Sequence, residues 1–213
     1  NLPVVFAVDR AGLVGSDGET HQGIFDLSYL SSMPNMHIMA PKNKWELSDM
    51  LKYAVNFGAP VAIRYPRGEA YAGLDTFRAP IEMCKAEPIY EEKDILLLAV
   101  GSMVKEAEEV RRILKEHGLH CSLTNARFVK PIDTEYVRVA AKTHPLIVTM
   151  EENVASGGFG EKVRTCLDEA RADAIVLQIA IPDEFVTHGK PEILMQQLRL
   201  DAASVADRIL DIL

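Results

Sequence analysis

Short hydrophobic runs alternate with longer amphipathic stretches along the chain. Five runs are continuously hydrophobic and predict buried strands: Pro3–Val8, Val61–Tyr65, Ile95–Val100, Leu146–Met150 and Ile175–Ile181. A strand without polar alternation is typical of a parallel sheet whose two faces are both covered by helices. The pattern therefore predicts an α/β protein in which parallel strands alternate with helices.

The stretches between these runs predict helices with recognisable ends. One such stretch has hydrophobic residues at the spacing of a single helical face: Leu47, Met50, Leu51, Ala54 and Val55. Five helices are predicted. Asn43 and Ser102 cap the first two, Asp133 or Thr134 begins the third, Gly158 introduces the fourth, and residues 201–213 form the last. Side chains or turns at such positions satisfy the free amides of a first helical turn.

Residues 66–94 break this alternation with prolines, glycines and the charged run Glu91-Glu92-Lys93-Asp94. Such a composition is typical of a connection between domains. We therefore expect two three-layer α/β/α units with mostly parallel sheets. The first covers residues 1–79, a linker covers 80–94, and the second unit covers 95–213.

The first predicted strand begins at residue 3 and has the hydrophobicity of a central strand. The sequence has no initiator Met and no element before this strand that would pair with it or cover it. We expect the chain to be part of a longer protein, with its first unit incomplete.

Composition excludes several classes of protein. The chain has 213 residues and a formal charge of −8, and nearly half of its residues are apolar, as in a soluble globular protein. This acidic balance disfavours a nucleic-acid partner, and no apolar run approaches the ~20 residues that span a bilayer. Cys84, Cys121 and Cys166 stand far apart without a CxxC spacing, which favours a reducing, cytoplasmic location over a disulfide scaffold.

The densest candidate chemistry follows the first strand, in residues 9–23. Arg10, Asp17 and His21 lie there among several glycines, and residues 1–78 carry a net charge of only −1, against −7 for the rest. In open α/β sheets, ligands bind beyond the carboxyl ends of the strands, and histidine exchanges protons near neutral pH. The alternative is a surface loop in which His21 and Asp17 merely bond to each other.

A second candidate, Arg67, follows the strand at Val61–Tyr65. If the two strands are parallel, Arg10 and Arg67 emerge at the same edge and converge on a phosphate through charge-assisted hydrogen bonds. Alternatively, both arginines pair with nearby carboxylates such as Asp9 or Glu69. The residues alone leave both interpretations open.

Glu151-Glu152-Asn153 and Ser156-Gly157-Gly158-Phe159-Gly160 close another strand and open a helix. Helix starts attract anions, but the spacing is neither G-x-G-x-x-G nor a Walker loop. We therefore predict a tight turn or a subunit contact here. The scattered histidines suggest no metal site, and the sequence has neither a G-x-S-x-G nor an H-E-x-x-H motif.

Several of these segments together resemble the 1-deoxy-D-xylulose-5-phosphate synthase family. They are Asp9–Gly23 followed by Phe25–Leu30, Arg64–Gly68, Arg127–Asp133, and Glu151–Asn153 with Gly157-Gly158. The likeness runs from residue 1 to the end of the chain and includes Leu200–Ala203. The later segments are shared in looser form with transketolase and the pyruvate dehydrogenase β subunit.

Members of this family are much longer than this chain, which resembles the end of their pyrimidine-binding domain and all of their transketolase-type C-terminal domain. The resemblance implies an enzyme that uses thiamine diphosphate and Mg²⁺ to condense pyruvate with glyceraldehyde 3-phosphate. The products are CO₂ and 1-deoxy-D-xylulose 5-phosphate, a precursor of isoprenoids, thiamine and pyridoxal.

The resemblance also implies roles for four residues. Arg10 and Arg67 match the arginines that hold the acceptor phosphate, and Asp17 and His21 match a polar pair near the cofactor and the acceptor hydroxyls, with His21 as the catalytic proton-transfer group. The Gly-Asp-Gly motif that binds Mg²⁺ and the diphosphate is absent. We therefore expect the missing N-terminal portion to bind both cofactors, this chain to be inactive alone, and the assembly to be a homodimer.

Two alternatives remain. In the first, the chain belongs to another transketolase-type enzyme, either a transketolase or a 2-oxoacid dehydrogenase β chain. The arginine pair and residues 16–23 argue against this alternative. In the second, it is a non-catalytic binding or dimerisation module, in which case phosphate esters leave its melting temperature unchanged.

Overall fold

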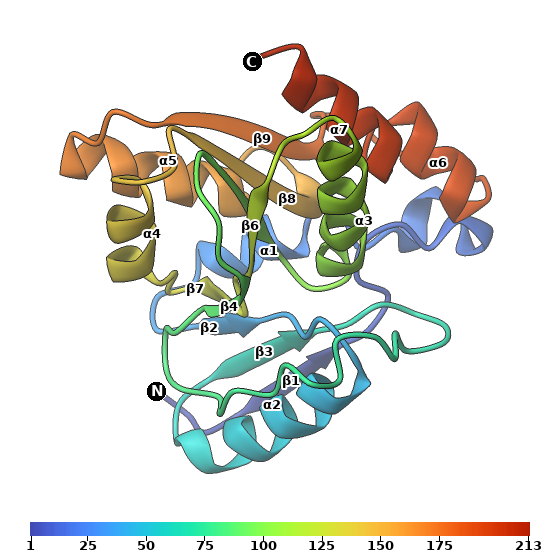
Figure 1. Ribbon diagram of the computed structural model, residues 1–213. Coiled ribbons are helices and arrows are strands. Elements are labelled where there is room, and N and C mark those ends of the chain that lie inside the picture. The colour runs from blue at the N-terminus through green and yellow to red at the C-terminus, as the bar shows by residue number, and fades with distance from the viewer.

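Two sheets form the frame of the computed structural model, which describes residues 1–213 apart from the side chain of Ser16 (Figure 1). The first sheet has the order β1 (Val5–Val8), β3 (Val61–Arg64), β2 (His37–Met39), β7 (Phe128–Lys130). The second has the order β4 (Glu87–Tyr90), β6 (Cys121–Asn125), β5 (Ile95–Ala99), β8 (Leu146–Val154), β9 (Ile175–Ile181). All neighbours are parallel except β2 with β7 and β4 with β6. The prediction of two α/β units with mostly parallel sheets is confirmed.

Seven α-helices surround the sheets: α1 (Asp26–Ser31), α2 (Lys44–Phe57), α3 (Met103–Glu116), α4 (Thr134–Ala140), α5 (Phe159–Ala170), α6 (Pro191–Gln197) and α7 (Ala202–Leu210). The side chain of Asn43 caps α2, as predicted, and Asp133 caps α4 at its predicted start. The terminal helix α7 is also found as predicted, and the side chain of Asp201 caps it. The predicted cap at Ser102 is wrong: its side chain makes no capping bond and instead donates to Glu152.

The hydrophobicity pattern did not predict four strands: β2, β4, β6 and β7. The strand β6 is fully buried although it contains Ser122, Thr124 and Asn125, whose polar atoms bond to side chains elsewhere in the fold. The strand β4 lies within the predicted connection over residues 66–94, so the prediction of irregular structure is wrong for Glu87–Tyr90. Its Pro88 is tolerated because β4 is an edge strand.

The position of β1 differs from the sequence prediction. It is an edge strand, paired only with β3, and not a central one. Phe6 is 45% exposed and Leu2, just before the strand, is 72% exposed. A hydrophobic run therefore marked the strand correctly, although no described residue covers its outer side.

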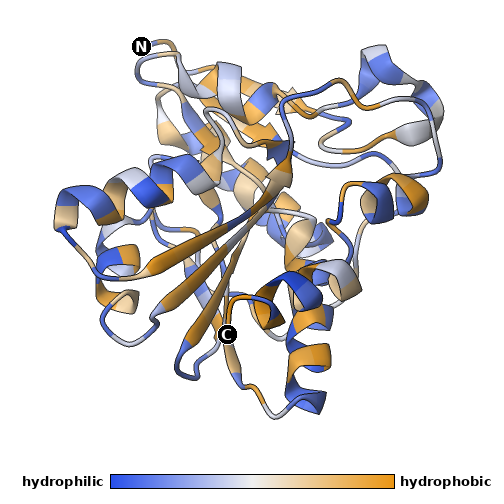
Figure 2. Ribbon diagram, turned by 90° about the horizontal axis from the view of Figure 1, so that it is seen from above, coloured by the Kyte–Doolittle hydropathy of each residue, from blue (hydrophilic) through white to orange (hydrophobic). Residues whose placement is uncertain are grey.

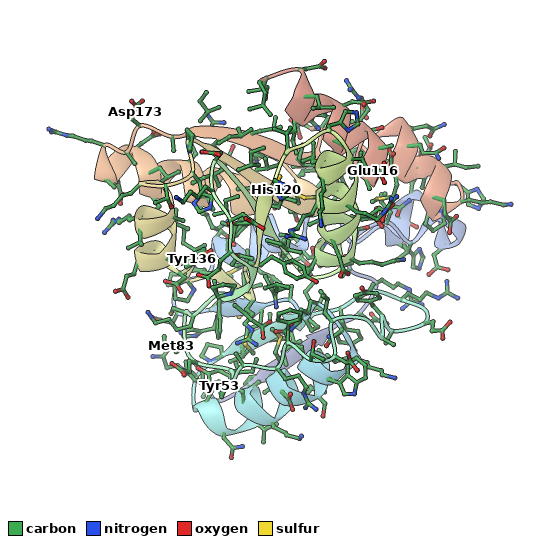
Figure 3. All side chains as sticks on the ribbon, in the orientation of Figure 1. Tyr53, Met83, Glu116, His120, Tyr136 and Asp173 are labelled. Carbon is green, nitrogen blue, oxygen red and sulfur yellow. The ribbon has the colours of Figure 1, made fainter. Side chains whose placement is uncertain are left out.

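The two sheets share a hydrophobic core. Helix α2 covers one face of the first sheet, with Met50 and Ala54 buried against Ile63, and Tyr53 stacks on Phe57 at its edge (Figure 3). On the opposite face of that sheet, helix α1 lies between the two sheets and contacts β2 and β8 (Figure 1). Ile38 and Ala62 lie there in one cluster with Leu96 and other residues of the second sheet, α1, α4 and α5.

The far face of the second sheet packs on α3 and α7. Figure 2 shows the strands of this sheet as almost continuously hydrophobic and the surrounding helices as mixed. The predicted division near residue 80 does not separate the two sheets, because β7 belongs to the first sheet and the two cores are joined. No helix among the described residues is long and apolar enough to cross a membrane.

Candidate functional site

The loop over residues 9–23 connects β1 to α1 at the carboxyl ends of β1 and β3. In Figure 1 it is the blue segment that leaves the first sheet and lies beside α3 and α6. Its two ends are held together, because Gly12 and Gly23 exchange backbone hydrogen bonds of 2.9 Å. The loop contains the short helices η1 (Gly15–Asp17) and η2 (Glu19–His21). Gly15 has a φ of +40° and touches the chain near α6: a Cβ there would lie 2.1 Å from the Gly189 carbonyl oxygen.

Arg10 and Arg67 converge on one carboxylate. Arg10 Nε donates to Asp17 Oδ2 at 3.0 Å, and Arg67 Nη1 donates to Asp17 Oδ1. Arg10 Nη1 also donates to Asp9 Oδ2 at 2.8 Å. The two arginines are thus brought together, as the strand order predicts, while the alternative of carboxylate partners also holds in this structure.

The arginines set the charge state of this cluster. The hydrogen bond from Arg10 is the main reason that the pKa of Asp17 lies below its ordinary value, and the same bond raises the pKa of Arg10. The Arg10 and Arg67 side chains are 40% and 52% exposed. Two permanent cations are therefore open to solvent. Their bonds to Asp9 and Asp17 use only part of their N–H groups, which leaves donors for an anionic ligand.

The backbone of Arg10 is in the left-handed region, with a φ of +58°. Non-glycine residues adopt this conformation rarely, because Cβ crowds the backbone there, and they do so preferentially at functional sites. The turn at Arg10 directs the chain from β1 into the loop.

His21 is exposed at the end of η2, and its Nδ1 lies 3.0 Å from Thr20 Oγ1. Asp17 bonds to the arginines, so the alternative in which His21 and Asp17 bond to each other is not what the structure contains. The imidazole is exposed and lies on the same loop as Arg10 and Asp17.

A cavity of about 550 Å³ lies beside Arg67. Its lining includes two carboxylates, Asp9 and Glu69, and four cationic side chains, Lys42, Lys44, Arg67 and Lys105. The volume is in the range of small-molecule sites, and the excess of cations suits an anion. Lys44 and Lys105 were not singled out from the sequence, because lysines on helix surfaces carry no signal of their place in the fold.

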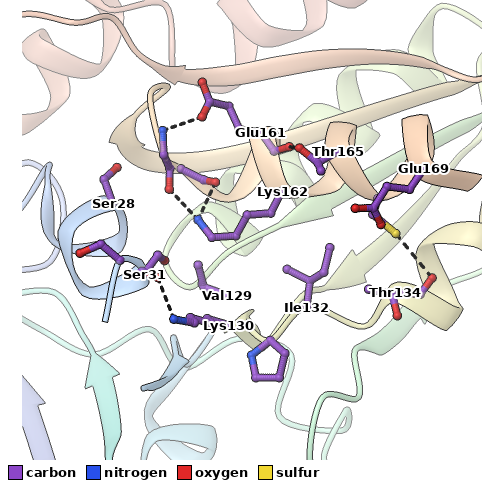
Figure 4. Close-up of a pocket in the computed structure, with 15 residues that line it drawn as sticks. Ser28, Ser31, Val129, Lys130, Ile132, Thr134, Glu161, Lys162, Thr165 and Glu169 are labelled. Atoms are coloured by element: carbon purple, nitrogen blue, oxygen red, sulfur yellow. Dashed lines mark hydrogen bonds between the residues drawn. The ribbon is translucent and has the colours of Figure 1, made fainter. Parts of the chain in front are cut away.

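A second cavity, of about 570 Å³, lies between α1, β7 and α5 (Figure 4). Its two ammonium groups already bind carbonyl oxygens: Lys130 Nζ lies 2.7 Å from Ser31 O, and Lys162 Nζ lies 2.9 Å from Gly158 O. These lysines hold the end of α1 and the turn before α5, where the predicted tight turn is found.

The start of α5 is likewise occupied by a carboxylate. Glu151 Oε2 and Oε1 accept from Phe159 N at 2.7 Å and Gly160 N at 2.8 Å. Burial raises the pKa of Glu151 to about 7. Since the side chain of Glu151 fills the place where an anion would bind, residues 156–160 are not a phosphate site.

The residues of this chain do not fit a thiamine diphosphate–Mg²⁺ site. Among the described residues no three His, Cys, Asp or Glu side chains are grouped so as to hold a metal ion. The sequence likewise lacks the Gly-Asp-Gly motif. The chemistry that this site offers is therefore anion binding by two arginines, with an exposed histidine on the same loop.

Two family models match the chain. The model of the transketolase pyrimidine binding domain matches residues 1–72, and that of the transketolase C-terminal domain matches residues 84–205. Curated relatives include the 1-deoxy-D-xylulose-5-phosphate synthases of Lachnoclostridium phytofermentans, 52% identical, and Caldanaerobacter subterraneus subsp. tengcongensis, 45% identical. Both alignments cover 98% of this chain, which spans about a third of the relatives' length (33% and 34%).

Solved structures show the same architecture. A chain described as a split gene transketolase, inactive beta4 tetramer, is 26% identical with a TM-score of 0.83, over 98% of this chain and 65% of that one. Transketolase from Campylobacter jejuni has a TM-score of 0.74 at 20% identity, over 97% of this chain and 31% of that one, a likeness in fold alone.

Proposed function

The chain belongs to the transketolase family, and we propose that it is the acceptor-binding third of a 1-deoxy-D-xylulose-5-phosphate synthase. The observation that carries this proposal is the convergence of Arg10 and Arg67 on one carboxylate at the carboxyl ends of β1 and β3. In the proposed reaction, pyruvate loses CO₂ and its remaining two-carbon unit is joined to glyceraldehyde 3-phosphate. The product, 1-deoxy-D-xylulose 5-phosphate, supplies isoprenoid, thiamine and pyridoxal synthesis.

In this proposal Arg10 and Arg67 bind the phosphate of glyceraldehyde 3-phosphate. Before the acceptor arrives, Asp17 keeps the two guanidinium groups close together, so little reorganisation is needed on binding. Asp17 then bonds to the arginines and the acceptor hydroxyls. His21 exchanges a proton with the aldehyde oxygen of the acceptor as the new carbon–carbon bond forms.

Thiamine diphosphate and Mg²⁺ are proposed to bind mainly to the rest of the enzyme, because the residues of this chain do not fit their site. The proposed complete enzyme is a cytoplasmic homodimer, since closed symmetric dimers are the commonest oligomers. It follows that this chain has no synthase activity by itself.

The open edge of β1 supports a missing partner. Leu2 and Phe6 are 72% and 45% exposed beside a row of backbone groups that no described strand pairs with. Exposed hydrophobic strand edges pair readily with further strands. We propose that the N-terminal portion of the same protein adds its strands to the first sheet at β1.

The test is reconstitution. The chain is mixed or co-expressed with the N-terminal two-thirds of a 1-deoxy-D-xylulose-5-phosphate synthase, and product formation from pyruvate and glyceraldehyde 3-phosphate is measured with thiamine diphosphate and Mg²⁺ present. We expect activity from the two parts together and none from either alone. His21→Ala in the active assembly should lower kcat with little change in either KM, and an unchanged kcat would remove the proton-transfer role.

The same experiment separates the alternatives. A transketolase or a 2-oxoacid dehydrogenase β chain would prefer other acceptors over glyceraldehyde 3-phosphate. A non-catalytic module is the second candidate, since a chain of similar fold is described as an inactive tetramer. In that case glyceraldehyde 3-phosphate would not raise the melting temperature of the chain, whereas a working Arg10–Arg67 site raises it.

A further inference from the structure

The last residues of β8 hold both flanks of the loop over residues 9–23. Glu152 Oε1 accepts from Leu13 N at 3.1 Å, near the start of the loop. Beyond its end, Val154 N donates to Ile24 O at 2.8 Å. A strand of the second sheet thereby fixes a loop that emerges from the first sheet.

Arg64, at the end of β3, joins the same two segments. Its Nη2 donates to Gly23 O at 2.6 Å and to Glu152 O at 2.7 Å, and its Nε donates to Asp26 Oδ1 at 2.8 Å. Arg64 is only 3% exposed. A buried guanidinium with an ionic partner and two carbonyl acceptors has a single stable geometry, so it holds the loop end against β8.

The carboxylate of Glu152 is fixed on both oxygens. Oε1 accepts from Leu13 N and Oε2 accepts from Ser102 Oγ at the start of α3. Its neighbour across the loop is Gly12, where a Cβ would lie 2.5 Å from Glu152 Oε1 and where φ is +74°. The loop thus has glycine where the Glu152 carboxylate approaches the loop backbone. The residue at position 12 is therefore restricted by a carboxylate that lies 140 positions later in the sequence.

We propose that Glu152 is a positioning residue of the acceptor site, acting through Leu13 N on the backbone that carries Arg10 and Asp17. This proposal rests on the proposed function. Leu13 lies between Arg10 and Asp17, so a shift of its amide moves both ends of the arginine–carboxylate cluster. Displacements of about 1 Å at a binding constellation are enough to weaken it many-fold. The second sheet therefore shapes the acceptor site as well as contributing to the hydrophobic core.

Glu151 provides a matched control. It precedes Glu152, and successive residues of a strand point to opposite faces, so its carboxylate holds α5 and not the loop. Both side chains are buried, at 0% and 9% exposure. Removing either carboxylate costs stability, but only one of them bonds to the site loop.

The experiment compares Glu152→Ala, Glu152→Gln and Glu151→Ala in the reconstituted enzyme. We expect Glu152→Ala to raise the KM for glyceraldehyde 3-phosphate about ten-fold or more, with the KM for pyruvate within about two-fold of the parent. Glu152→Gln keeps an acceptor for Leu13 N and should restore most of the acceptor KM. Glu151→Ala should leave both KM values unchanged.

An unchanged acceptor KM in Glu152→Ala overturns the proposal, and so does an equal rise in Glu151→Ala. If Glu152→Ala does not fold, Ser102→Ala removes only the second contact of the carboxylate. A smaller rise in the acceptor KM alone then supports the proposal, and no rise overturns it. Arg67→Ala shows whether the proposed function itself fails. If Arg67→Ala also leaves the acceptor KM unchanged, the proposed function fails together with this inference. If Arg67→Ala raises the acceptor KM and Glu152→Ala does not, only the positioning role of Glu152 is rejected.

Discussion

Two clusters of charged side chains in this chain have opposite designs. The buried cluster consists of Lys42, Glu46, Glu87, Asn125 and Arg127, and the exposed cluster consists of Asp9, Arg10, Asp17 and Arg67. In the buried cluster two cations face two carboxylates, with no side chain more than about 5% exposed. In the exposed cluster two arginines likewise face two carboxylates, Asp9 and Asp17, but these side chains are 19% to 59% exposed.

The number of partners explains the difference. Arg127 donates to Glu46 and to the carbonyl oxygens of Ala79 and Pro80, and its Nη2 forms an ion pair with Glu87 Oε1, all at N···O distances of 2.7 to 2.9 Å. Every strong donor of the buried cluster is used, as low-dielectric surroundings require. Arg10 and Arg127 both have a left-handed backbone, with φ of +58° and +57°. The same local conformation thus occurs in the exposed cluster, where we propose ligand binding, and in the buried cluster, which joins two sheets.

The largest expected effect is in the buried cluster. Arg127→Met leaves Glu46 and Glu87 with Lys42 as their only cation, and breaking a buried ion pair in this way costs about 3–5 kcal/mol. The free energy of unfolding, measured by urea denaturation, should fall by that amount. Arg112→Met, which removes an exposed arginine paired with Glu109 and Glu116, is the control and should leave the midpoint unchanged. Equal losses in the two variants would contradict the distinction between the clusters.

A substitution in the exposed cluster should weaken acceptor binding and leave the free energy of unfolding nearly unchanged. In the reconstituted enzyme, Arg67→Ala should raise the KM for glyceraldehyde 3-phosphate about ten- to a hundred-fold, because a charge-assisted bond to phosphate is lost. The KM for pyruvate and the unfolding midpoint should stay near the parent values. Arg78→Ala is the control, since Arg78 has similar exposure and pairs with Asp49 away from the site. A parallel rise in both KM values would rule out a phosphate-specific role.

Glu151 is a third ionisable group, and its surroundings differ from those of both clusters. Glu151 is buried, but its hydrogen-bond partners are backbone amides, and burial raises its pKa to about 7 from an ordinary 4.5. Between these values the folded protein keeps a proton that the unfolded chain releases, so this group's contribution to stability is fully present below pH 4.5 and is lost as the pH rises through 7.

The pH effect is measurable by urea denaturation between pH 4.5 and 7.5. Relative to Glu151→Gln, the parent should lose on the order of 1–3 kcal/mol of unfolding free energy across this window. If parent and variant change in parallel with pH, the carboxyl does not titrate there.

The smallest expected effect comes from salt. Raising the ionic strength from about 0.05 to 0.5 M should weaken acceptor binding several-fold, because exposed charges are screened and buried ones are not. The acceptor KM and the unfolding midpoint of the same sample are the two measurements. A fall in the unfolding midpoint at high salt would mean that ions of the solvent screen the buried cluster, which would contradict its burial.

Sequence reasoning identified what depends on local pattern. Continuous hydrophobicity located β1, β3, β5, β8 and β9, and the rule that parallel strands end at one edge brought Arg10 and Arg67 together. Sequence reasoning missed β6 because Ser122, Thr124 and Asn125 are polar, and they are buried only because their hydrogen-bond partners lie at distant positions of the sequence. Hydrophobicity also does not distinguish a central strand from an uncovered edge strand, hence the error at β1.

Ser102 shows the limit most clearly. A serine before an amphipathic stretch predicts an N-cap, and the helix does begin there, yet its hydroxyl bonds to Glu152, fifty positions away. Glu46, three residues after the cap Asn43, keeps a local partner, since the backbone N and Nζ of Lys42 both donate to it, and it adds the distant partners Asn125 and Arg127. Tertiary partners thus replace the local bond at Ser102 and add to the local bonds at Glu46, and only the fold reveals them.

The joined cores of the two sheets have a consequence for folding. Because Ile38 and Ala62 pack in the same cluster as Leu96, neither sheet has a complete core without the other. Melting one sheet exposes apolar area of both, so the chain should unfold in a single cooperative transition, with equal calorimetric and van't Hoff enthalpies. The two sequence families matched in this chain therefore meet in one cooperative folding unit.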